Sequence, residues 1–284
     1  MRTLALDLGN STLFAGVFDD GRLLRSVRLD VGRGLPPSPR LRRAGLTPPT
    51  QAVSGKAGSG DPALQNHSMA DDVLIAALKR FARGKIERIA LCSVVPDRTD
   101  PLCGAVRNAF GVEPQILTAA AGHGLKIGYR QPHRLGPDRI ATVLGARKLH
   151  PQQNVIVVDC GTATTITVAD RAGRLHGGSI LPGLGLWPAM LAQRTARLPA
   201  VTLRTPATVV ARDTAAAIRS GAIIGHAGAI RELVARSRAE VFGRQRVVVL
   251  GTGGMVTHLK DQRLFTAVEP GLILHGLDFF LRQA

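Results

Sequence analysis

The chain carries two copies of one short pattern, in which an apolar strand ends on an aspartate and turns through a glycine into small hydroxylated residues. One copy spans Val155–Val168 and has Asp159, Gly161 and Thr162 at its turn. The β-branched run before Asp159 is typical of a buried strand, and Gly161 permits a tight reversal. We interpret this copy as a β-hairpin whose tip binds an anion through backbone amides and threonine hydroxyls. Taken alone, it is equally compatible with an ordinary hairpin that has one turn aspartate.

The second copy of the pattern opens the chain. Residues Thr3–Val17 again give an apolar strand, Asp7, one further residue, a glycine and a hydroxylated run. Asp7 and Asp159 are 152 positions apart in a chain of 284 residues, and self-similarity on this scale predicts two related units. We therefore expect two halves, residues 1–149 and 150–284, each opening with a phosphate-facing hairpin, and a nucleotide in the cleft between them.

Composition places the chain among α/β proteins that are large enough to bury two cores. Hydrophobic residues make up 45% of the sequence and aromatic residues only 4%, which suits helices and strands rich in Ala, Val and Leu. The net charge of +17 comes from 37 basic residues, of which six are lysine. A G+C-rich genome produces such an arginine-rich composition, and a binding site for a polyanion is the alternative.

Cysteine content and hydropathy indicate the compartment. Cys92, Cys103 and Cys160 have no Cys-x-x-Cys spacing, so the sequence predicts neither a disulfide framework nor a zinc site. No signal-peptide pattern opens the chain, and no apolar run approaches the roughly 20 residues of a membrane span. We expect a cytoplasmic protein that does not bind a membrane.

Apolar periodicity and turn residues predict the other elements. Strands are expected over 23–30, 86–95, 114–117 and 247–250, and helices over 97–110, 140–149, 187–195 and 214–242, and after Pro270. A further helix is expected to have Ser68 as its N-cap and a buried face of Val73, Leu74, Ala77, Leu78 and Phe81. Gly177–Gly178 and 182–185 are expected turns. Residues 32–67, rich in Gly, Pro, Ser and Arg, are interpreted as a flexible insertion, with a polyanion-binding arm as the alternative.

Several strings of residues occur in an order that is specific to one family. They are Asp7-Leu8-Gly9-Asn10-Ser11, Ser93-Val94-Val95-Pro96, Gly136-Pro137-Asp138-Arg139, Asp159-Cys160-Gly161-Thr162-Ala163-Thr164-Thr165, Gly177-Gly178-Ser179-Ile180-Leu181-Pro182-Gly183, Leu198-Pro199 and the helix that opens at Thr214. With these strings the chain resembles the type III pantothenate kinases of the acetate and sugar kinase/Hsp70/actin superfamily. The resemblance implies an α/β fold of two duplicated ribonuclease H-like (actin-like ATPase) domains with a nucleotide cleft between them.

The resemblance also implies a reaction. A protein of this family transfers a phosphoryl group from ATP to pantothenate and forms 4'-phosphopantothenate, the first step of coenzyme A biosynthesis. It implies a magnesium ion with the ATP, a monovalent cation, potassium or ammonium, in the site, and a homodimer with the pantothenate pocket near the subunit interface. Nucleic acid is not expected as a partner.

Matched position by position, the resemblance assigns a role to individual residues. It makes Asp138 the proton acceptor and Asp159 the ligand of the monovalent cation. The residues implied to bind ATP are Asp7, Leu8, Gly9, Asn10, Ser11, Thr12, Leu13, Phe14 and Thr162. Those implied to bind pantothenate are Tyr129, Gly136, Pro137, Asp138, Arg139 and Thr214.

The residue types fit this chemistry on physical grounds as well. Phosphoryl transfer asks a protein for alignment and charge stabilisation, which hydroxyls, turn amides and aspartate-held cations supply. Asp138 suits a general base, although a carboxylate there also stabilises a helix N-terminus by roughly 0.3–1 kcal/mol. Arg139 could hold the pantothenate carboxylate or be one more surface arginine. The Gly251–Gly254 turn could lie next to adenine or ribose, or be a plain turn.

The chain departs from the family pattern in three places, and two other functions compete with the kinase. Ser11 stands where threonine is common, Pro137 stands where alanine is common, and the insertion at 32–67 is atypical. One rival is a non-enzymatic transcriptional accessory factor that binds nucleic acid through its basic surface, with steep salt dependence. The other is an actin-like nucleotide switch, which does not need an alcohol-activating base such as Asp138.

Overall fold

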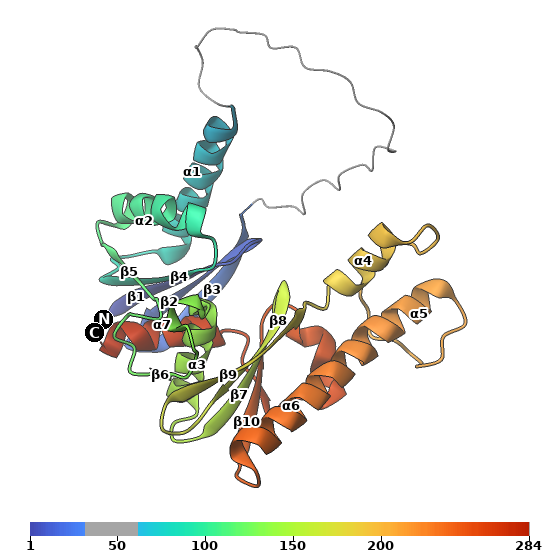
Figure 1. Ribbon diagram of the computed structural model, residues 1–284. Helices are drawn as coiled ribbons and strands as arrows, with labels where there is room; N and C mark the ends of the chain where they lie inside the picture. Colours follow the sequence, from blue (N-terminus) through green and yellow to red (C-terminus); the bar gives the residue numbers. More distant parts are fainter. Residues whose placement is uncertain (32–61, 284) are drawn as a thin grey trace, which may run out of the picture.

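The computed structural model describes residues 1–31 and 62–283, which form an α/β molecule with two mixed sheets (Figure 1). The predicted insertion at 32–67 lies outside these residues as far as position 61. Its last part, 62–67, belongs to a helix rather than to a linker. Among the described helices, none has both the length and the apolar character that crossing a bilayer requires.

The first sheet has the strand order β3-β2-β1-β4-β5. Its first three strands form an antiparallel meander, and the last two are parallel to β1. The strands are β1 (Arg2–Leu8), β2 (Thr12–Asp19), β3 (Arg22–Asp30), β4 (Arg88–Ser93) and β5 (Pro114–Ile116). Side chains alternate between the two faces. Leu4 and Leu6 face α1 (Pro62–Ala82) and α2 (Pro96–Phe110), whereas Ala5, and with it Asp7, faces the opposite side.

The second sheet has the order β11-β10-β7-β8-β9-β6. Its strands are β7 (Asn154–Cys160), β8 (Ala163–Ala169), β9 (Arg174–Pro182), β10 (Val247–Thr252), β11 (Ala267–Val268) and the added edge strand β6 (Lys126–Ile127). Apart from β6, strand order and strand directions repeat those of the first sheet. The duplicated α/β fold predicted from the two hairpins is therefore confirmed.

One long helical segment covers the second sheet. α5 (Thr214–Ser220) continues through a π-helical turn, Gly221–Gly225, into α6 (His226–Phe242). Apolar side chains of this segment pack on β7 and β8. α4 (Leu186–Arg194) and the beginning of α5 extend away from the sheet (Figure 1). The short helices η1 (Pro132–Arg134) and η3 (Val256–Gln262) complete the connections.

Two helices, α3 (Pro137–Leu149) and α7 (Leu272–Gln283), pack against each other between the sheets. Glycines set their separation. A Cβ on Gly276 would lie 1.7 Å from the Ala141 carbonyl oxygen, and a Cβ on Gly145 would lie 2.0 Å from that of Leu272. A larger residue at either position would push the helices, and with them the two halves, apart.

A buried carboxylate ties α7 to the first half. Asp278 is 0% exposed and accepts hydrogen bonds from Thr3 Oγ1 at 2.7 Å, Lys148 Nζ at 2.8 Å and Arg282 Nε at 3.1 Å. These donors satisfy the charge and lower the pKa of Asp278 despite its burial. α7 also contacts β1, β2 and β4. β6 precedes residue 150 in the sequence but lies in the second sheet, and α7 follows residue 150 but packs on the first sheet. The boundary at 149/150 therefore stays a prediction.

Several expected local features differ in the structure. Ser68 is not the N-cap of α1, because the helix starts at Pro62, a residue that the first turn of a helix tolerates. Val73 is 70% exposed rather than buried. Gly177 and Gly178 lie inside β9, and their positive φ angles of 136° and 148° accommodate an irregularity in the β8–β9 register instead of a turn. The helix expected to open at Thr214 is capped by the residue before it, Asp213, whose side chain accepts from Ala216 N at 2.8 Å.

Candidate active site

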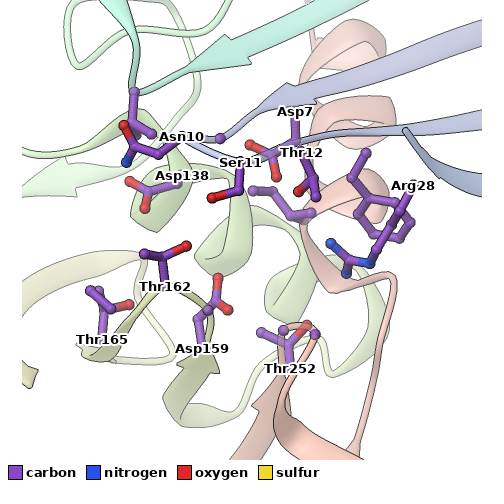
Figure 2. Close-up of a pocket in the computed structure, with 18 of the residues that line it drawn as sticks. Asp7, Asn10, Ser11, Thr12, Arg28, Asp138, Asp159, Thr162, Thr165 and Thr252 are labelled. Carbon is purple, nitrogen blue, oxygen red and sulfur yellow. The ribbon is translucent and has the colours of Figure 1, made fainter. Parts of the chain in front are cut away.

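A pocket lies where the two hairpin turns face each other (Figure 2), and it encloses about 810 Å³ of empty space, its open mouth included. Both sheets, the residue after β4, the first turn of α3 and the start of α7 with the loop before it contribute to its walls. The residues that line it are Asp7, Gly9, Asn10, Ser11, Thr12, Phe14, Arg28, Val94, Asp138, Asp159, Gly161, Thr162, Ala163, Thr165, Thr252, Gly253, Gly254, Pro270 and Ile273.

Strand register places the two hairpin aspartates. Asp7 is paired with Cys92 on β4, and Asp159 is paired with Thr252 on β10, so each carboxylate ends the central strand of its sheet. Cys92 Sγ donates to Asp7 Oδ1 at 3.3 Å. Gly253 has φ 91°, and a Cβ there would lie 2.4 Å from Asp159 Oδ1. The predicted glycine turn after β10 is thus a close approach to Asp159.

The turns themselves leave polar side chains free to face the pocket. The amide of Gly9 donates to the Thr12 carbonyl at 2.9 Å, and the amide of Gly161 donates to the Ala163 carbonyl at 3.0 Å, so both amides close their own turns. Asn10, Ser11 and Thr162 are exposed at these turns. Of the residues predicted to bind ATP, only Leu8 and Leu13 do not line the pocket, since both are buried in the core under α1 and α2.

A third carboxylate enters the pocket from the first turn of α3. Gly136 and Pro137 open this helix, and Asp138 follows them. Burial raises the pKa of Asp138, an effect that hydrogen bonding to the backbone of Arg139 and the charge of its guanidinium partly offset. Gly136 and Pro137 line no described pocket and serve to begin the helix.

The three carboxylates give the pocket more negative than positive charge, because Arg28 is the only basic side chain among the described residues that line it. Burial, followed by the charges of Asp159 and Asp138, raises the pKa of Asp7 to about 7. Burial and the charge of Asp138 raise the pKa of Asp159 to about 6. Either a proton or a cation relieves such a cluster. Carboxylate and hydroxyl oxygens are the ligands that hard cations such as Mg²⁺ prefer, so the donor set fits the predicted cations.

Arg139 is a buried arginine rather than a surface one, since only 4% of it is exposed. Its Nε donates to Thr167 Oγ1 at 2.9 Å, its Nη2 donates to the Ile166 carbonyl at 3.1 Å, and its Nη1 donates to the Tyr129 hydroxyl. Arg139 therefore fixes the position of Tyr129. Tyr129 lines a second, more open pocket with Gly128, Arg130, Gln131, Arg134, His176, Gly177 and Gly178.

Thr214 is the predicted substrate residue that the structure does not bring to the others. It is exposed at the first position of α5 and lines neither pocket. α4 and the beginning of α5 form an arm that extends from the second sheet (Figure 1). Within one chain, Asp138 lines the first pocket and Tyr129 lines the second, whereas Thr214 lines neither.

Sequence reasoning missed several pocket residues. They are Arg28, Val94, Ala163, Thr165, Pro270 and Ile273. The turn with Thr252, Gly253 and Gly254, which was expected either to lie next to adenine or ribose or to be a plain turn, also lines the pocket. The register of the second hairpin could have found Thr165, because it lies opposite Asp159. Arg28 lies opposite Phe14 only because the β2–β3 register shifts between Val17 and Phe18. The other positions depend on how the two halves meet.

Two sheets of the same order, with carboxylates and hydroxyls from both hairpin turns in one pocket, define a phosphoryl-transfer protein with an actin-like ATPase fold. Solved structures share this fold over the whole chain. A ROK family glucokinase from Streptomyces griseus, in complex with glucose and AMPPNP, gives a TM-score of 0.52 at 14% identity and covers 100% of both chains. A Baf family transcriptional activator from Campylobacter jejuni gives a TM-score of 0.56 at 17% identity and covers 99% of this chain and 98% of its own. At such identities the likeness shows the fold alone.

Sequence comparison identifies the family. The type III pantothenate kinase family model matches residues 51–236. A type III pantothenate kinase of Legionella pneumophila (strain Corby) is 40% identical over 192 residues, which are 68% of this chain and 75% of its own. Type III pantothenate kinase 1 of Francisella tularensis subsp. holarctica (strain OSU18) is 32% identical over 279 residues, 96% of each chain. The protein belongs to the type III pantothenate kinase family, so it is an enzyme that phosphorylates pantothenate for coenzyme A biosynthesis.

Proposed function

We propose that the pocket between the hairpins holds the ATP phosphates and that Asp138 activates the pantothenate hydroxyl beside them. The observation that supports this most directly is the convergence of Asp7, Asp138 and Asp159 with turn hydroxyls in one pocket. Asp7, Gly9–Thr12, Phe14 and Thr162 would surround the phosphates. Leu8 and Leu13 would support the first turn from the core.

The reaction then follows from the position of these groups. The pantothenate hydroxyl oxygen attacks the γ-phosphorus and forms the new P–O bond, while its proton passes to Asp138. The bond from the γ-phosphorus to the β–γ bridging oxygen breaks, and ADP leaves with that electron pair. Magnesium bound with ATP would supply charge neutralisation for the phosphates. Asp159 is our candidate ligand of the monovalent cation, because burial and the charge of Asp138 raise its pKa and the charge of Arg28 offsets this only in part.

We place the pantothenate carboxylate in the second pocket. The hydroxyl and the carboxylate are at opposite ends of pantothenate, and Asp138 and Arg139 are adjacent residues that serve the first and the second pocket respectively. Arg139 orients the Tyr129 hydroxyl, and Arg130, Arg134 and His176 bring positive charge or donors to the same wall. Gly136 and Pro137 would bind substrate only through the helix start that they form.

We also propose a cytoplasmic homodimer in which Thr214 contacts pantothenate held by the partner subunit. Thr214 lines neither pocket of its own chain. The arm and its surroundings expose apolar side chains that a second copy would cover: Met190 is 54% exposed, Val209 69% and Val210 84%. Exposed apolar patches of this kind mark protein interfaces.

A coupled assay of ADP release with and without pantothenate tests the proposed reaction. ADP release that depends on pantothenate, and that yields one 4'-phosphopantothenate for each ADP, supports it. Release of ADP at the same rate without pantothenate would mean that the pocket hydrolyses ATP without transferring the phosphoryl group to the alcohol. Binding to DNA with a steep salt dependence and no turnover would favour the transcriptional alternative instead.

A further inference from the structure

Arg28 lies in the same row of side chains as Asp7. Asp7 on β1 is paired with Phe14 on β2, and Phe14 is paired with Arg28 on β3. Residues directly opposite each other on neighbouring strands project from the same face of a sheet, so all three side chains reach the pocket. The Arg28 guanidinium carbon lies 3.7 Å from the centroid of the Phe14 ring. This cation–π stacking holds the long side chain against the pocket wall.

Within the part of the chain that the structure describes, the hydrogen-bond donors of Arg28 have no partner. Across residues 1–31 and 62–283, no side chain or carbonyl forms a hydrogen bond or ion pair with it, whereas all three nitrogens of Arg139 are engaged. Stacking on a ring occupies the face of a guanidinium and leaves its in-plane N–H groups free. Arg28 is also the only basic side chain among the described residues that line this pocket. A planar fork of donors with no protein partner suits phosphate oxygens.

Arg28 and Asp138 lie on opposite sides of the pocket. Figure 2 shows Asp7 and Asp159 between them. The electrostatics agree with this order: the Asp138 charge raises the pKa of both Asp7 and Asp159, the Arg28 charge lowers both, and Arg28 has no part in the pKa shift of Asp138. Thr252 lies near the Arg28 side in the same view.

This order of groups matches the two ends of an in-line displacement. The attacking oxygen enters beside Asp138, so the leaving oxygen must point away from it. We propose that Arg28 binds the β-phosphate of ATP and stabilises the negative charge that develops on the ADP leaving group. The inference rests on the proposed role of Asp138. The electron pair of the broken P–O bond stays on the β–γ bridging oxygen, and the Arg28 donors offset that charge without taking a proton.

The second half has no equivalent of Arg28. The corresponding row there is Asp159, Thr165 and Ile180, so its third position is apolar and 67% exposed. Only the first sheet would thus supply an arginine that stabilises the leaving-group charge. A residue at the equivalent position of the second sheet could not compensate for the loss of Arg28.

The experiment compares Arg28→Met, which keeps length and removes charge, with Arg28→Lys, which keeps charge and removes the fork. Arg25→Met is the matched control. Arg25 lies on the same strand and also stacks on a phenylalanine, with its guanidinium carbon 5.7 Å from the Phe81 centroid, but it faces α1 and donates to the Ala82 carbonyl. For each variant we would measure turnover with ATP and pantothenate, the melting temperature, and the binding of ADP and AMP by calorimetry.

We expect Arg28→Met to lower turnover by a factor of about 10²–10³, the usual loss on removing one stabilising donor. The same variant should bind ADP more weakly and AMP as tightly as the wild type. Arg28→Lys should recover part of the turnover, and Arg25→Met should affect only the melting temperature. Wild-type turnover and ADP affinity in Arg28→Met would overturn the proposal. Equally weakened binding of ADP and AMP, together with a lower melting temperature, would also overturn the proposal, because a purely structural role of Arg28 predicts that result. Since nucleotide binding is measured without pantothenate, this outcome is separate from a failure of the proposed acceptor chemistry.

Discussion

Asp7 and Asp159 occupy the same position in two sheets of the same strand order, and their carboxylates face one pocket. Burial and the charges of Asp159 and Asp138 raise the pKa of Asp7 to about 7, and burial and the charge of Asp138 raise that of Asp159 to about 6. The equivalence follows from the duplicated hairpin. As a consequence of the duplication, two buried carboxylates face one pocket, and they are stable as anions only beside a cation.

The first prediction concerns pH. Because both pKa values are higher in the folded protein than the 3.9 or so of an unfolded aspartate, the folded protein binds more protons and should lose stability as pH rises from about 4 to about 7. We expect the melting temperature of ligand-free protein, measured with only a bulky organic cation present, to fall over this range. Asp7→Asn should flatten the fall. Glu113→Gln, a change at an exposed carboxylate 3.2 Å from Arg107, should leave it as it is.

A second prediction concerns the monovalent cation. If Asp159 holds it beside the phosphates, replacing potassium by a tetraalkylammonium ion that is too large for the pocket should abolish turnover. Ammonium should restore turnover in part, because its size and charge are similar to those of potassium. Asp159→Asn should be slow in every salt and should lose the difference between potassium and the organic ion. Full activity of the wild type without potassium or ammonium would remove this role from Asp159.

The third prediction concerns the crossing of α3 and α7. A Cβ on Gly276 would lie 1.7 Å from the Ala141 carbonyl oxygen, whereas a Cβ on Gly104, inside α2, has nothing within 4 Å. Alanine is intrinsically better than glycine in a helix by up to about 1 kcal/mol. Gly104→Ala should therefore raise the free energy of unfolding, and Gly276→Ala should lower it by about 1–3 kcal/mol because backbone must move. Denaturant unfolding of both variants measures this difference, and equal behaviour would contradict the close crossing.

Much of the fold was predictable because its signals are local. The apolar runs before Asp7 and Asp159 define the central strands, and the glycine turns define the hairpins. The errors arose where a local signal had two physical meanings. Positive-φ glycines at 177–178 indicate a turn as readily as an irregular strand, and Ser68 has the side chain of a cap while lying inside a helix. The packing of α7 on the first sheet could not be read from local sequence, since it joins segments more than 250 residues apart, such as Thr3 and Asp278.

The site residues likewise fall into those that a local sequence signal predicts and those whose place depends on contacts between distant segments. Asn10, Ser11 and Thr162 were found because a hairpin turn carries its own polar residues to the pocket. Arg28 was missed because its place depends on the β2–β3 register, which has an irregularity at Val17–Phe18. Thr214 lies away from both pockets of its own chain, and its predicted role therefore depends on a second chain.

The fourth prediction tests that dependence. Val210, 84% exposed next to the start of α5, should be covered in a homodimer. Val210→Asp should shift the protein from dimer to monomer in sedimentation and raise the KM for pantothenate, because the partner's arm would no longer complete the pocket. Val73→Asp is the control, since Val73 is 70% exposed on α1, far along the chain from the arm. A monomeric variant with unchanged KM would disconnect the dimer from the substrate pocket.

The last prediction concerns Asp138, on which the proposed chemistry depends most. If Asp138 accepts the proton of the pantothenate hydroxyl, Asp138→Asn keeps its shape, loses its basicity and should lower turnover by about 10²–10⁴, with ATP and pantothenate still bound. If the carboxylate merely stabilises the start of α3, the same variant should lose at most about 1 kcal/mol of stability and keep its turnover.

The chain supplies a matched control for this distinction. α2 opens with Pro96–Asp97 as α3 opens with Pro137–Asp138, so both aspartates sit in the first turn of a helix behind a proline. Asp97 is exposed and lines no described pocket. Asp97→Asn should therefore show only the small loss in melting temperature that the helix terminus predicts. Burial also raises the pKa of Asp138, so removing its ionisable group should, if anything, stabilise the ligand-free protein. A variant that is as stable as the wild type and markedly slower would have the signature of a general base, whereas wild-type turnover in Asp138→Asn would exclude that role.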